Sequence, residues 1–515
     1  MFELVGTLAC ALALFPAGAR WLRVAQREHY LAGSTSRFAW RWWCLRPPAP
    51  VMAAGALAGA GFAFAYPLVA LAPAAVVVVG PPSLGVRGRT APLVFTPRMR
   101  RLTAAWLVLQ ALVIAIGILV HHAALFAALG ACAVPVVVDA AAAVLSPLER
   151  RLVTPYVTAA QARLAQLAPT VVAITGSFGK TSTKQHVAHL LAGSCTVVAS
   201  PASFNNRAGL ARAVNEQLLP GTDVFVAEMG TYGKGEIAEL CRWCPPAIAV
   251  ITAIGPVHLE RFKREEAIVA AKSEITETAH TVVLNVDNPH LAALADRLAA
   301  AGTKVVVRCS AVDTAADVCV EGAGGVATVH VRGTVAGAGI ALPGSVQPTN
   351  LACALAVVFA LDVPHEVALS RIATLPTVPN RLASGQAPSG VWVIDDTFNS
   401  NPAGARVALA ELAARGGDGP GDGRGDGRRV VVTPGMVELG PLQFEANRAF
   451  AEEIARVATD LVIVGHTNRR ALRAGCAPLR PLCVRTRDEA VTWVRATLGP
   501  GDAVLYENDL PDHYR

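Results

Sequence analysis

The sequence has little charge. Only 16% of its 515 residues are Asp, Glu, Lys or Arg, against roughly 25% in an average globular protein, while 53% are hydrophobic. This balance excludes a disordered or a fibrous chain. At about 150 residues a domain, the length predicts three or four domains. The 11 cysteines lack the spacing of a disulfide framework, which is typical of a reducing compartment.

Charge is absent from long stretches near the N-terminus. Residues 4–19 carry none, residues 47–86 carry none over 40 positions, and residues 102–148 carry a single acid. A helix needs about 20 apolar residues to cross a bilayer, so the second and third stretches are each long enough for two spans. The pair Tyr66-Pro67 marks the turn of the second. We therefore expect about five transmembrane spans.

The positive charge of the chain lies in the loops between these stretches. Residues 20–48 carry six Arg and one Glu, and residues 81–102 carry five Arg and no acid. Because such loops stay on the cytoplasmic side, five spans predict an outside N-terminus and cytoplasmic domains in a multi-pass protein of the cell membrane. A single crossing by residues 47–86 is the alternative. The charge gives no support for nucleic-acid binding.

Two features of the membrane part have competing interpretations. Residues 1–19 resemble a signal peptide only weakly, because Glu3 precedes the apolar run and no Lys or Arg does. Asp139 lies in an apolar run, so it is either a functional residue or one that serves at a helix end.

The character of the chain changes after residue 165. An apolar strand pattern at 171–174 runs into the sequence TGSFGKTST (175–183), and a helical pattern follows up to Gly193. This strand, glycine-rich turn and helix form the context of a phosphate-binding loop, in which Lys180 supplies positive charge and the Thr181 hydroxyl a ligand for Mg²⁺. Ile174 stands where the longer loop pattern has Gly.

Further motifs follow in a fixed order. They are SFNNRAG (203–209), AEMG (227–230), GEI (235–237), GPVHLE (255–260), AKSEI (271–275), LNVD (284–287), NRL (380–382), IDDTFNSNP (394–402) and GMVELG (435–440). With the loop at 175–183, the chain resembles the Mur ligase family, most closely its D-alanyl-D-alanine-adding branch.

The resemblance implies an α/β fold. It predicts a central P-loop domain over about 166–378 and a C-terminal Rossmann-like domain over 379–515. An α-helical transmembrane domain (1–150) and an amphipathic linker (151–165) precede them, where the family has a soluble domain for a UDP-sugar substrate.

The resemblance also implies an ATP-dependent ligase that joins a carboxylate to an amine through an acyl phosphate. ATP and Mg²⁺ are the expected cofactors. Phosphoryl transfer needs cations and oxygen ligands around the phosphates. The residues expected around ATP are Thr175, Gly176, Ser177, Phe178, Gly179, Lys180, Thr181 and Ser182 in the loop, with Asn285, Arg381, Asp395 and Asp396.

Four side chains carry the expected metal site: Thr181, Glu228, His258 and Lys272, the last as a carbamate in many family members. Catalytic roles are implied for Lys180, His258, Lys272 and Arg381. The alternatives for single residues are an exposed strand-end Glu228, a structural His258, a surface Lys272 and a solvated Arg381. Asn285 is expected to face the adenine, Asp396 the ribose, and Arg381 the γ-phosphate.

Departures from the family put its substrate contacts in question. Residues 344–347 read Gly-Ser-Val-Gln where a Gly-x-His-Asn pattern is usual, and residues 507–512 replace a Lys-Gly-Ser-type ending. The carboxylate and amine substrates are therefore open, with lipid-linked or membrane-proximal ones and partner proteins of envelope synthesis among the possibilities. A poly-γ-glutamate-type synthase and a non-catalytic nucleotide-gated scaffold are the alternative functions.

Three other features are weak. The pair Cys241 and Cys244 lacks the further ligands of a zinc site. Asn399 and Asn401 are expected either at the nucleotide or at the start of the next helix. Residues 416–429 read as a glycine-rich loop.

Overall fold

The structure is a computed structural model that describes residues 1–44, 48–82, 84–86, 92–398, 400–415, 427–510 and 513–514. The chain divides into two compact units. The first unit comprises Met1–Val153 with Leu510–Arg515, and the second comprises Thr154–Asp509. Residues 510–515, expected in the C-terminal domain, thus group with the N-terminal helices.

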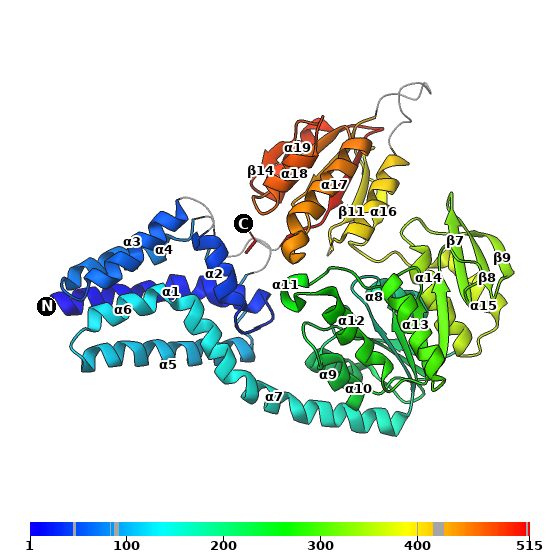
Figure 1. Ribbon diagram of the computed structural model, residues 1–515, viewed down its shortest axis with the longest axis horizontal. Helices are drawn as coiled ribbons and strands as arrows, with labels where there is room; N and C mark the ends of the chain where they lie inside the picture. Colours follow the sequence, from blue (N-terminus) through cyan, green and yellow to red (C-terminus); the bar gives the residue numbers. More distant parts are fainter. Residues whose placement is uncertain are drawn as a thin grey trace. The chain divides into compact units, whose positions relative to one another are not determined.

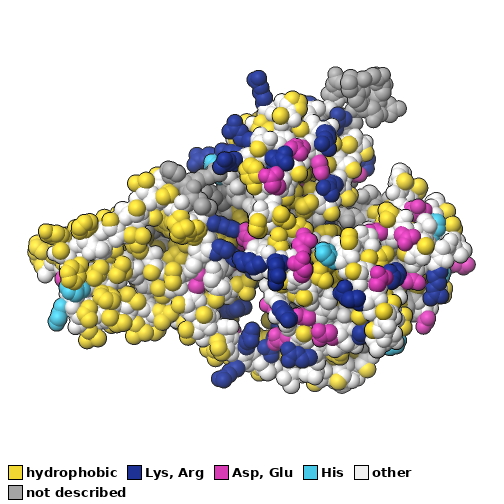
Figure 2. Space-filling view, in the orientation of Figure 1, with side chains coloured by type: hydrophobic (Ala, Val, Ile, Leu, Met, Phe, Trp, Pro, Cys, Tyr) yellow, Lys and Arg dark blue, Asp and Glu magenta, His cyan; other side chains and the backbone are white. Residues whose placement is uncertain are grey.

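The first unit is helical (Figure 1). Its elements are α1 (Phe2–Arg27), α2 (Ser34–Cys44), α3 (Ala49–Phe62), η1 (Pro67–Ala70), α4 (Leu71–Val79), α5 (Pro97–Leu119), α6 (Ala123–Cys132) and the first part of α7 (Val134–Leu167). Its visible surface is largely hydrophobic, whereas acidic and basic side chains mix over the second unit (Figure 2).

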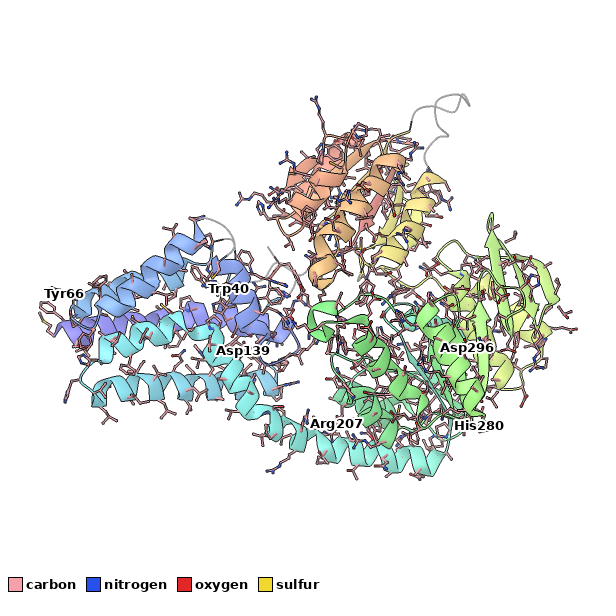
Figure 3. The ribbon with its side chains drawn as sticks, viewed as in Figure 1. Trp40, Tyr66, Asp139, Arg207, His280 and Asp296 are labelled. Carbon is pink, nitrogen blue, oxygen red and sulfur yellow. The ribbon has the colours of Figure 1, made fainter. Side chains whose placement is uncertain are left out.

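Within the described residues, α1 and α5 are long and apolar enough to cross a membrane, and α6 with α7, bent by 78°, would make a third span. Five spans were expected. The difference arises partly at residues 47–86, where α3 and Pro67–Val79 form a hairpin around Tyr66 (Figure 3). An arm of 14 residues is about 20 Å long, short of the roughly 30 Å hydrocarbon core.

Arg20 is buried inside the first unit, where it caps α4. Its guanidinium donates to the carbonyl oxygens of Val77 (3.0 Å), Val78 (3.0 Å), Gly80 (2.6 Å) and Leu84 (2.8 Å). The last carbonyls of a helix have no partner within the helix and carry partial negative charge. Arg20, expected in a basic loop, thus lies in α1 and stabilises the second arm of the hairpin.

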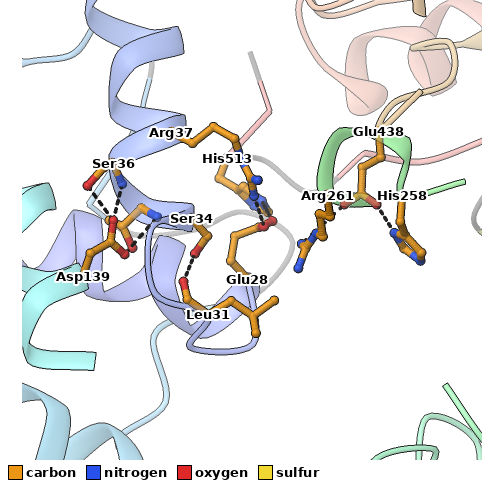
Figure 4. Close-up of polar contacts among 11 residues, drawn as sticks. Glu28, Leu31, Ser34, Ser36, Arg37, Asp139, His258, Arg261, Glu438 and His513 are labelled. Carbon is orange, nitrogen blue, oxygen red and sulfur yellow. Dashed lines mark hydrogen bonds and ion pairs between the residues drawn. The ribbon is translucent and has the colours of Figure 1, made fainter. Parts of the chain in front are cut away.

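Asp139 serves at a helix end. Its carboxylate accepts hydrogen bonds from Thr35 N (3.2 Å), Ser36 N (2.7 Å) and Ser36 Oγ (2.5 Å) at the start of α2 (Figure 4). The contact offsets the positive end of the helix dipole. Of the two interpretations open from the sequence, this geometry favours the structural one.

The end of the chain completes the core of the first unit. His513 Nε2 lies 3.0 Å from Glu28 Oε1, and Trp42 Nε1 donates to His513 O at 2.8 Å. The Phe38 ring lies edge-on to the rings of His513 and Tyr514, with centroids 4.7 and 5.0 Å away. Glu28 and His513 are 5% and 1% exposed, so this is a buried polar pair and not a surface contact.

The second unit opens with a nine-stranded sheet in the order β2-β3-β1-β4-β5-β6-β7-β8-β9, parallel up to β7 and antiparallel beyond it. Its strands are β1 (Thr170–Thr175), β2 (Val197–Ala199), β3 (Val224–Glu228), β4 (Ile248–Ile251), β5 (Thr281–Asn285), β6 (Val305–Ser310), β7 (Val318–Ala323), β8 (Val326–Val331) and β9 (Thr334–Ala341). The apolar runs predicted as buried strands are confirmed as its central members.

Helices connect the strands of this sheet. They are α8 (Lys180–Leu191), α9 (Arg207–Gln217), α10 (Glu236–Trp243), α11 (Leu259–Phe262), α12 (Glu265–Ser273), η2 (Glu274–Thr276), α13 (Pro289–Ala301), α14 (Pro348–Ala360), α15 (His365–Ser370) and η3 (Ile372–Thr374). Apolar residues of α8 and α14 pack on the sheet in one core.

A second sheet of six strands follows, in the order β10-β11-β15-β12-β13-β14, with β10 antiparallel to the rest. Its elements are β10 (Ala383–Gln386), β11 (Trp392–Asp396), α16 (Pro402–Ala413), β12 (Arg429–Thr433), η4 (Gly440–Leu442), α17 (Gln443–Val457), β13 (Asp460–Val464), α18 (Arg469–Gly475), β14 (Leu482–Val484), α19 (Arg487–Thr497) and β15 (Ala503–Glu507). The α/β class predicted for both domains is confirmed. Functional side chains gather where the parallel strands of such sheets end.

Candidate active site

The loop between β1 and α8 requires its glycines. Gly176 and Gly179 have φ angles of +152° and +84°. A Cβ on Gly176 would lie 2.0 Å from Thr252 Oγ1, and one on Gly179 would lie 2.3 Å from Asn350 Oδ1. Ser177 N donates to Ala253 O at 2.8 Å, which ties the loop to the segment after β4. The loop is thus held open at the N-terminus of α8, as anion binding requires.

Two lysines donate to one carbonyl oxygen of this loop. Lys180 Nζ lies 2.8 Å and Lys272 Nζ 3.0 Å from Gly176 O. Burial lowers the pKa of Lys180 to about 8, although Glu228 opposes the shift. Burial, with Lys180 nearby, also lowers the pKa of Lys272 well below its usual value. The structure therefore brings together the two lysines that the sequence singled out, and Lys272 is not a surface residue.

Glu228 ends β3 beside the first residues of α8. Its Oε2 accepts hydrogen bonds from Thr181 Oγ1 and Lys184 Nζ, both at 3.0 Å, and its Oε1 accepts one from Asn205 Nδ2 at 3.1 Å. Burial alone would raise the pKa of Glu228, but Lys184 and Lys180 outweigh it and lower the pKa. Glu228 is therefore an anion at neutral pH.

The pair of Thr181 and Glu228 fits a Mg²⁺ ion. The described residues contain no cluster of three or more His, Cys, Asp and Glu side chains that could hold a metal by themselves. Mg²⁺ instead takes one or two protein oxygens and completes its octahedron with water and phosphate. One hydroxyl and one ionised carboxylate, 3.0 Å apart beside a phosphate loop, supply such a donor set.

Arg381 reaches this loop from the start of the C-terminal domain. Its Nη2 lies 3.4 Å from Thr181 Oγ1, and its guanidinium stacks 4.5 Å from the ring centre of Phe398. Burial lowers the pKa of Arg381, with Glu228 and Asp396 opposing the shift. The guanidinium is thus part of the polar cluster and not a solvated linker residue. Phe398, which the sequence analysis gave no role, orients it.

His258 lies in a different contact. Its Nδ1 is paired with Glu438 Oε2, while Arg261 Nη2 lies 3.7 Å from Glu438 Oε1 (Figure 4). The Tyr232 ring packs edge-on to His258, with centroids 5.2 Å apart. Within the described residues, His258 is not hydrogen-bonded to Thr181 or Glu228. Glu438 belongs to the GMVELG motif, which signalled its importance without giving its partner.

The residues expected around the nucleoside are held by local hydrogen bonds. Asn285 Nδ2 donates to Thr252 O (3.0 Å), and its Oδ1 accepts from Asp287 N (3.2 Å). Asp395 Oδ1 accepts from Thr397 N (3.2 Å) and Oγ1 (2.6 Å). Both side chains shape the strand ends on which they stand.

Asp396 is tied to the residue after Arg381. Its Oδ1 accepts a hydrogen bond from Leu382 N at 3.0 Å, which holds β11 to the start of the C-terminal domain. The sequence analysis missed Lys184 and Asn205, the two further partners of Glu228. Asn205 stands in the FNN motif, but nothing in the pattern marks Lys184.

The weak sequence features have structural roles where they are described. Cys241 and Cys244 are buried free thiols, and Cys241 Sγ lies 3.8 Å from Met229 Sδ. Asn401 caps α16 by accepting from Gly404 N at 3.1 Å. Asn399 and most of the loop predicted at 416–429 lie outside the described residues.

Comparison with known proteins agrees with this geometry. Residues 174–358 match the Mur ligase middle domain, and residues 380–506 match the Mur ligase, glutamate ligase domain. The chain is 35% identical over 371 residues to a UDP-N-acetylmuramoyl-tripeptide–D-alanyl-D-alanine ligase of Mycobacterium leprae, covering 65% of this chain and 70% of the relative. It is 32% identical over 399 residues to the enzyme of the same name from Mycobacterium tuberculosis, covering 71% and 74%.

Solved structures share the fold. MurF ligase from Thermotoga maritima in complex with ADP aligns with a TM-score of 0.59 at 24% identity, over 69% of this chain and 80% of the other. MurF from Acinetobacter baumannii aligns with the same TM-score at 23% identity, over 69% and 77%. The resemblance read from the motifs is therefore confirmed, and the chain belongs to the Mur ligase family, as a MurF-like, ATP- and Mg²⁺-dependent ligase that forms peptide bonds in peptidoglycan synthesis.

Proposed function

We propose that the second unit activates a carboxylic acid as an acyl phosphate, at a membrane to which the first unit attaches it. A carboxylate oxygen of the first substrate bonds to the γ-phosphorus of ATP, and ADP leaves. The nitrogen of the second substrate then bonds to the carbonyl carbon, phosphate leaves, and the nitrogen loses a proton. The products are an amide, ADP and phosphate.

The observation that carries the proposal is the contact of Arg381, Thr181 and Glu228. Arg381 reaches within 3.4 Å of the Thr181 hydroxyl, which itself lies 3.0 Å from Glu228. A cation from the C-terminal domain thus meets the phosphate loop at the pair of oxygens that fits Mg²⁺. Charge neutralisation and positioning are what phosphoryl transfer demands of a protein.

The other charged residues of the site have separate proposed roles. Lys180 neutralises phosphate charge at the loop, while Arg381 stabilises the γ-phosphate as it transfers. Lys272 is buried beside Gly176, where a carbamate on its Nζ would turn a cation into a ligand for Mg²⁺. His258 stays a candidate metal ligand by resemblance to the family, although its Nδ1 is paired with Glu438 Oε2 in the structure. When bound, Mg²⁺ neutralises and orients the phosphate oxygens.

Asn285, Asp395 and Asp396 border the nucleoside. These three stand at the carboxyl ends of β5 and β11. We assign Asn285 to the adenine and Asp396 to the ribose. The ribose hydroxyls can donate hydrogen bonds, which a carboxylate accepts. Asp395 holds the turn that follows β11.

The proposed substrates are a peptidoglycan-type peptide as the acid and a short peptide or amino acid as the amine. The relatives named above add D-alanyl-D-alanine to a UDP-N-acetylmuramoyl tripeptide. In this chain, the helices of the first unit lie where the resemblance expects a UDP-sugar domain. Attachment to a membrane raises the local concentration of any substrate held there. A lipid-linked or membrane-proximal precursor is therefore the favoured acid.

The test of the chemistry is a ligation assay. Purified full-length protein is incubated with ATP, Mg²⁺ and pairs of envelope precursors and amines, and phosphate release and product mass are followed. We expect ADP only when both an acid and an amine are present. Lys180→Ala should abolish the product, whereas Arg332→Ala, which alters an exposed cation of the β8–β9 hairpin, should not. Hydrolysis of ATP indifferent to both substrates would contradict the proposal.

The test of the membrane attachment uses fractionation and a reporter. Full-length protein should sediment with membranes, and a chain lacking residues 1–150 should not. A reporter fused after Arg151 should be cytoplasmic. A full-length chain that stays in the supernatant, or an external reporter, would contradict the assignment.

A further inference from the structure

Asp396 and Glu507 stand side by side at the ends of two strands. β11 and β15 are parallel neighbours, and their register pairs Asp396 with Glu507. Paired residues of adjacent strands lie about 5 Å apart with side chains on the same face. The two carboxyl groups are within hydrogen-bonding reach of each other. Two carboxylates so close would repel strongly in a buried site.

Glu507 lacks the partners that a buried carboxylate needs. The residue is 0% exposed. Its Oε1 accepts a hydrogen bond from Ser400 Oγ, but its Oε2 is buried and receives no hydrogen bond from a donor among the described residues. A bare anion there would leave an unpaired oxygen beside another acid. A proton on Glu507 removes the charge and gives the group a donor.

Asp396 has better support for a negative charge. Its Oδ1 accepts from Leu382 N, and Arg381 lies nearby, although Asp395 on the same strand adds an opposing charge. Burial raises the pKa of Asp396 to about 6, against these stabilising contacts. Burial and the neighbouring Asp396 raise the pKa of Glu507 well above its usual value. Both shifts have the same direction, and the contacts of Asp396 with Leu382 N and Arg381 favour its charge over that of Glu507.

We propose that Glu507 is a positioning residue for the nucleotide site, which stays protonated at neutral pH and donates a hydrogen bond to ionised Asp396. The donated bond holds Asp396 in its orientation and preserves its charge despite burial. The inference deepens the proposed function, because it rests on the assignment of Asp396 to the ribose hydroxyls. It also gives a role to the first residue of the segment that departs from the family's Lys-Gly-Ser-type ending.

The experiment measures affinity for the non-hydrolysable ATP analogue AMP-PNP with Mg²⁺, by calorimetry on the full-length protein between pH 5 and 8. Glu507→Gln keeps the shape and a donor, and Glu507→Leu removes the donor. Glu452→Gln, which alters a partly exposed acid on α17, is the matched control. AMP-PNP itself changes protonation with pH, but this affects wild type and variant equally. The ratio of the two affinities at each pH therefore reports the protein alone.

We expect wild-type affinity to fall below about pH 6, by about tenfold per pH unit, as Asp396 is protonated. Glu507→Gln should keep this profile. Glu507→Leu should move the fall upward by about one pH unit, which is about fivefold weaker binding than the wild type at pH 6 and about tenfold weaker at pH 5.

Three results would overturn the inference: a wild-type profile without a fall in this range, a fall displaced downward by a unit in Glu507→Gln, or a Glu507→Leu profile like that of the wild type. If Glu507→Leu does not fold, the first two still decide. The pH profiles of AMP-PNP affinity and the ligation assay are separate readouts. If the three proteins show the expected profiles but the wild type makes no ligation product, the proposed function is contradicted and the inference about Glu507 is not.

Discussion

Thr181 is the residue on which the two halves of the active site converge. Its hydroxyl donates to Glu228 Oε2 at 3.0 Å and accepts from Arg381 at 3.4 Å. One oxygen atom thus connects the phosphate loop, the end of β3 and the C-terminal domain. Removing it deletes a proposed Mg²⁺ ligand and a contact of two charged side chains together.

We predict that Thr181→Ala lowers kcat/KM for ligation by about 100-fold, the order seen when one preorganised polar group of an active site is removed. Thr181→Ser keeps the hydroxyl and should stay within about fivefold of the wild type. Phosphate release in the presence of both substrates measures the effect. Equal losses in both variants would show that the methyl group matters and not the oxygen.

His186 of α8 predicts a pH dependence of stability. It is 2% exposed, and its buried Nδ1 has no hydrogen-bond partner among the described residues. Burial lowers the pKa of His186 to about 4, below its ordinary value near 6.5. Because the unfolded chain binds the proton first, stability falls as the pH drops from 6.5 to 4, by up to about 3 kcal/mol.

Thermal unfolding of the full-length protein between pH 5 and 7.5 measures this loss. His186→Gln cannot bind a proton, so its midpoint should change less over that range. A wild-type and a variant that respond identically to pH would rule out His186 as the cause.

The sequence predicted the members of this polar cluster better than their contacts. Lys180, Thr181, Glu228, Lys272 and Arg381 were all singled out, and the structure places them around the loop that follows β1. Local motifs indicate them because phosphate chemistry demands particular residue types. Lys184, Phe398 and the pairing of His258 with Glu438 depend on contacts between residues far apart in the chain, which no local pattern reveals.

At the scale of elements, helix ends are stabilised by side chains both adjacent and distant in sequence. Asn401, adjacent to α16, was an expected cap, and it accepts from Gly404 N. Arg20 caps α4 and Asp139 caps α2 from other helices. The sequence offered the first as one of two interpretations because Asn-Pro starts helices, whereas Asp139 was noted only as an acid in an apolar run and Arg20 only as part of a basic loop.

We predict that Asp139→Ala destabilises the first unit by about 1 kcal/mol, since the first N–H groups of α2 lose their acceptor. The thermal midpoint of the full-length protein should fall by roughly 2–4 °C. Asp139→Asn keeps an acceptor oxygen and should lose less. An unchanged midpoint in Asp139→Ala would mean that water replaces the carboxylate.

The span count shows where composition is a poor guide to an element. An uncharged stretch of 40 residues predicted two full spans, but Pro67 and the turn before it divide it into arms of about four turns each. Uncharged residues outside the arms lie in the connections. A stretch without charge therefore indicates an apolar segment, but it does not give the length of the helices within it.

At the scale of the whole molecule, the first unit is built from both ends of the chain. It comprises Met1–Val153 together with Leu510–Arg515. His513 fills a buried position between Glu28 and the Phe38 ring. Glu28 would be left as a buried acid with fewer partners if this segment were absent.

We predict that a chain ending at Asp509 has a less stable first unit, because the buried acid Glu28 loses one of its partners and Trp42 Nε1 loses the His513 carbonyl. Its helices should be cleaved faster by protease in detergent than those of the full-length protein. Affinity of the second unit for AMP-PNP should be unchanged, which separates the effect from general unfolding. Equal protease resistance would show that the segment adds nothing to the first unit.

The return of residues 510–515 to the N-terminal helices also sets an order in biosynthesis. The helices of residues 1–153 are made first, yet their core stays incomplete until His513 and Tyr514 leave the ribosome. During translation of the intervening 356 residues, Thr154–Asp509, the N-terminal helices lack the contacts that His513 and Tyr514 make with Glu28 and Phe38. A message cut short anywhere in that interval therefore yields an N-terminal unit without these contacts.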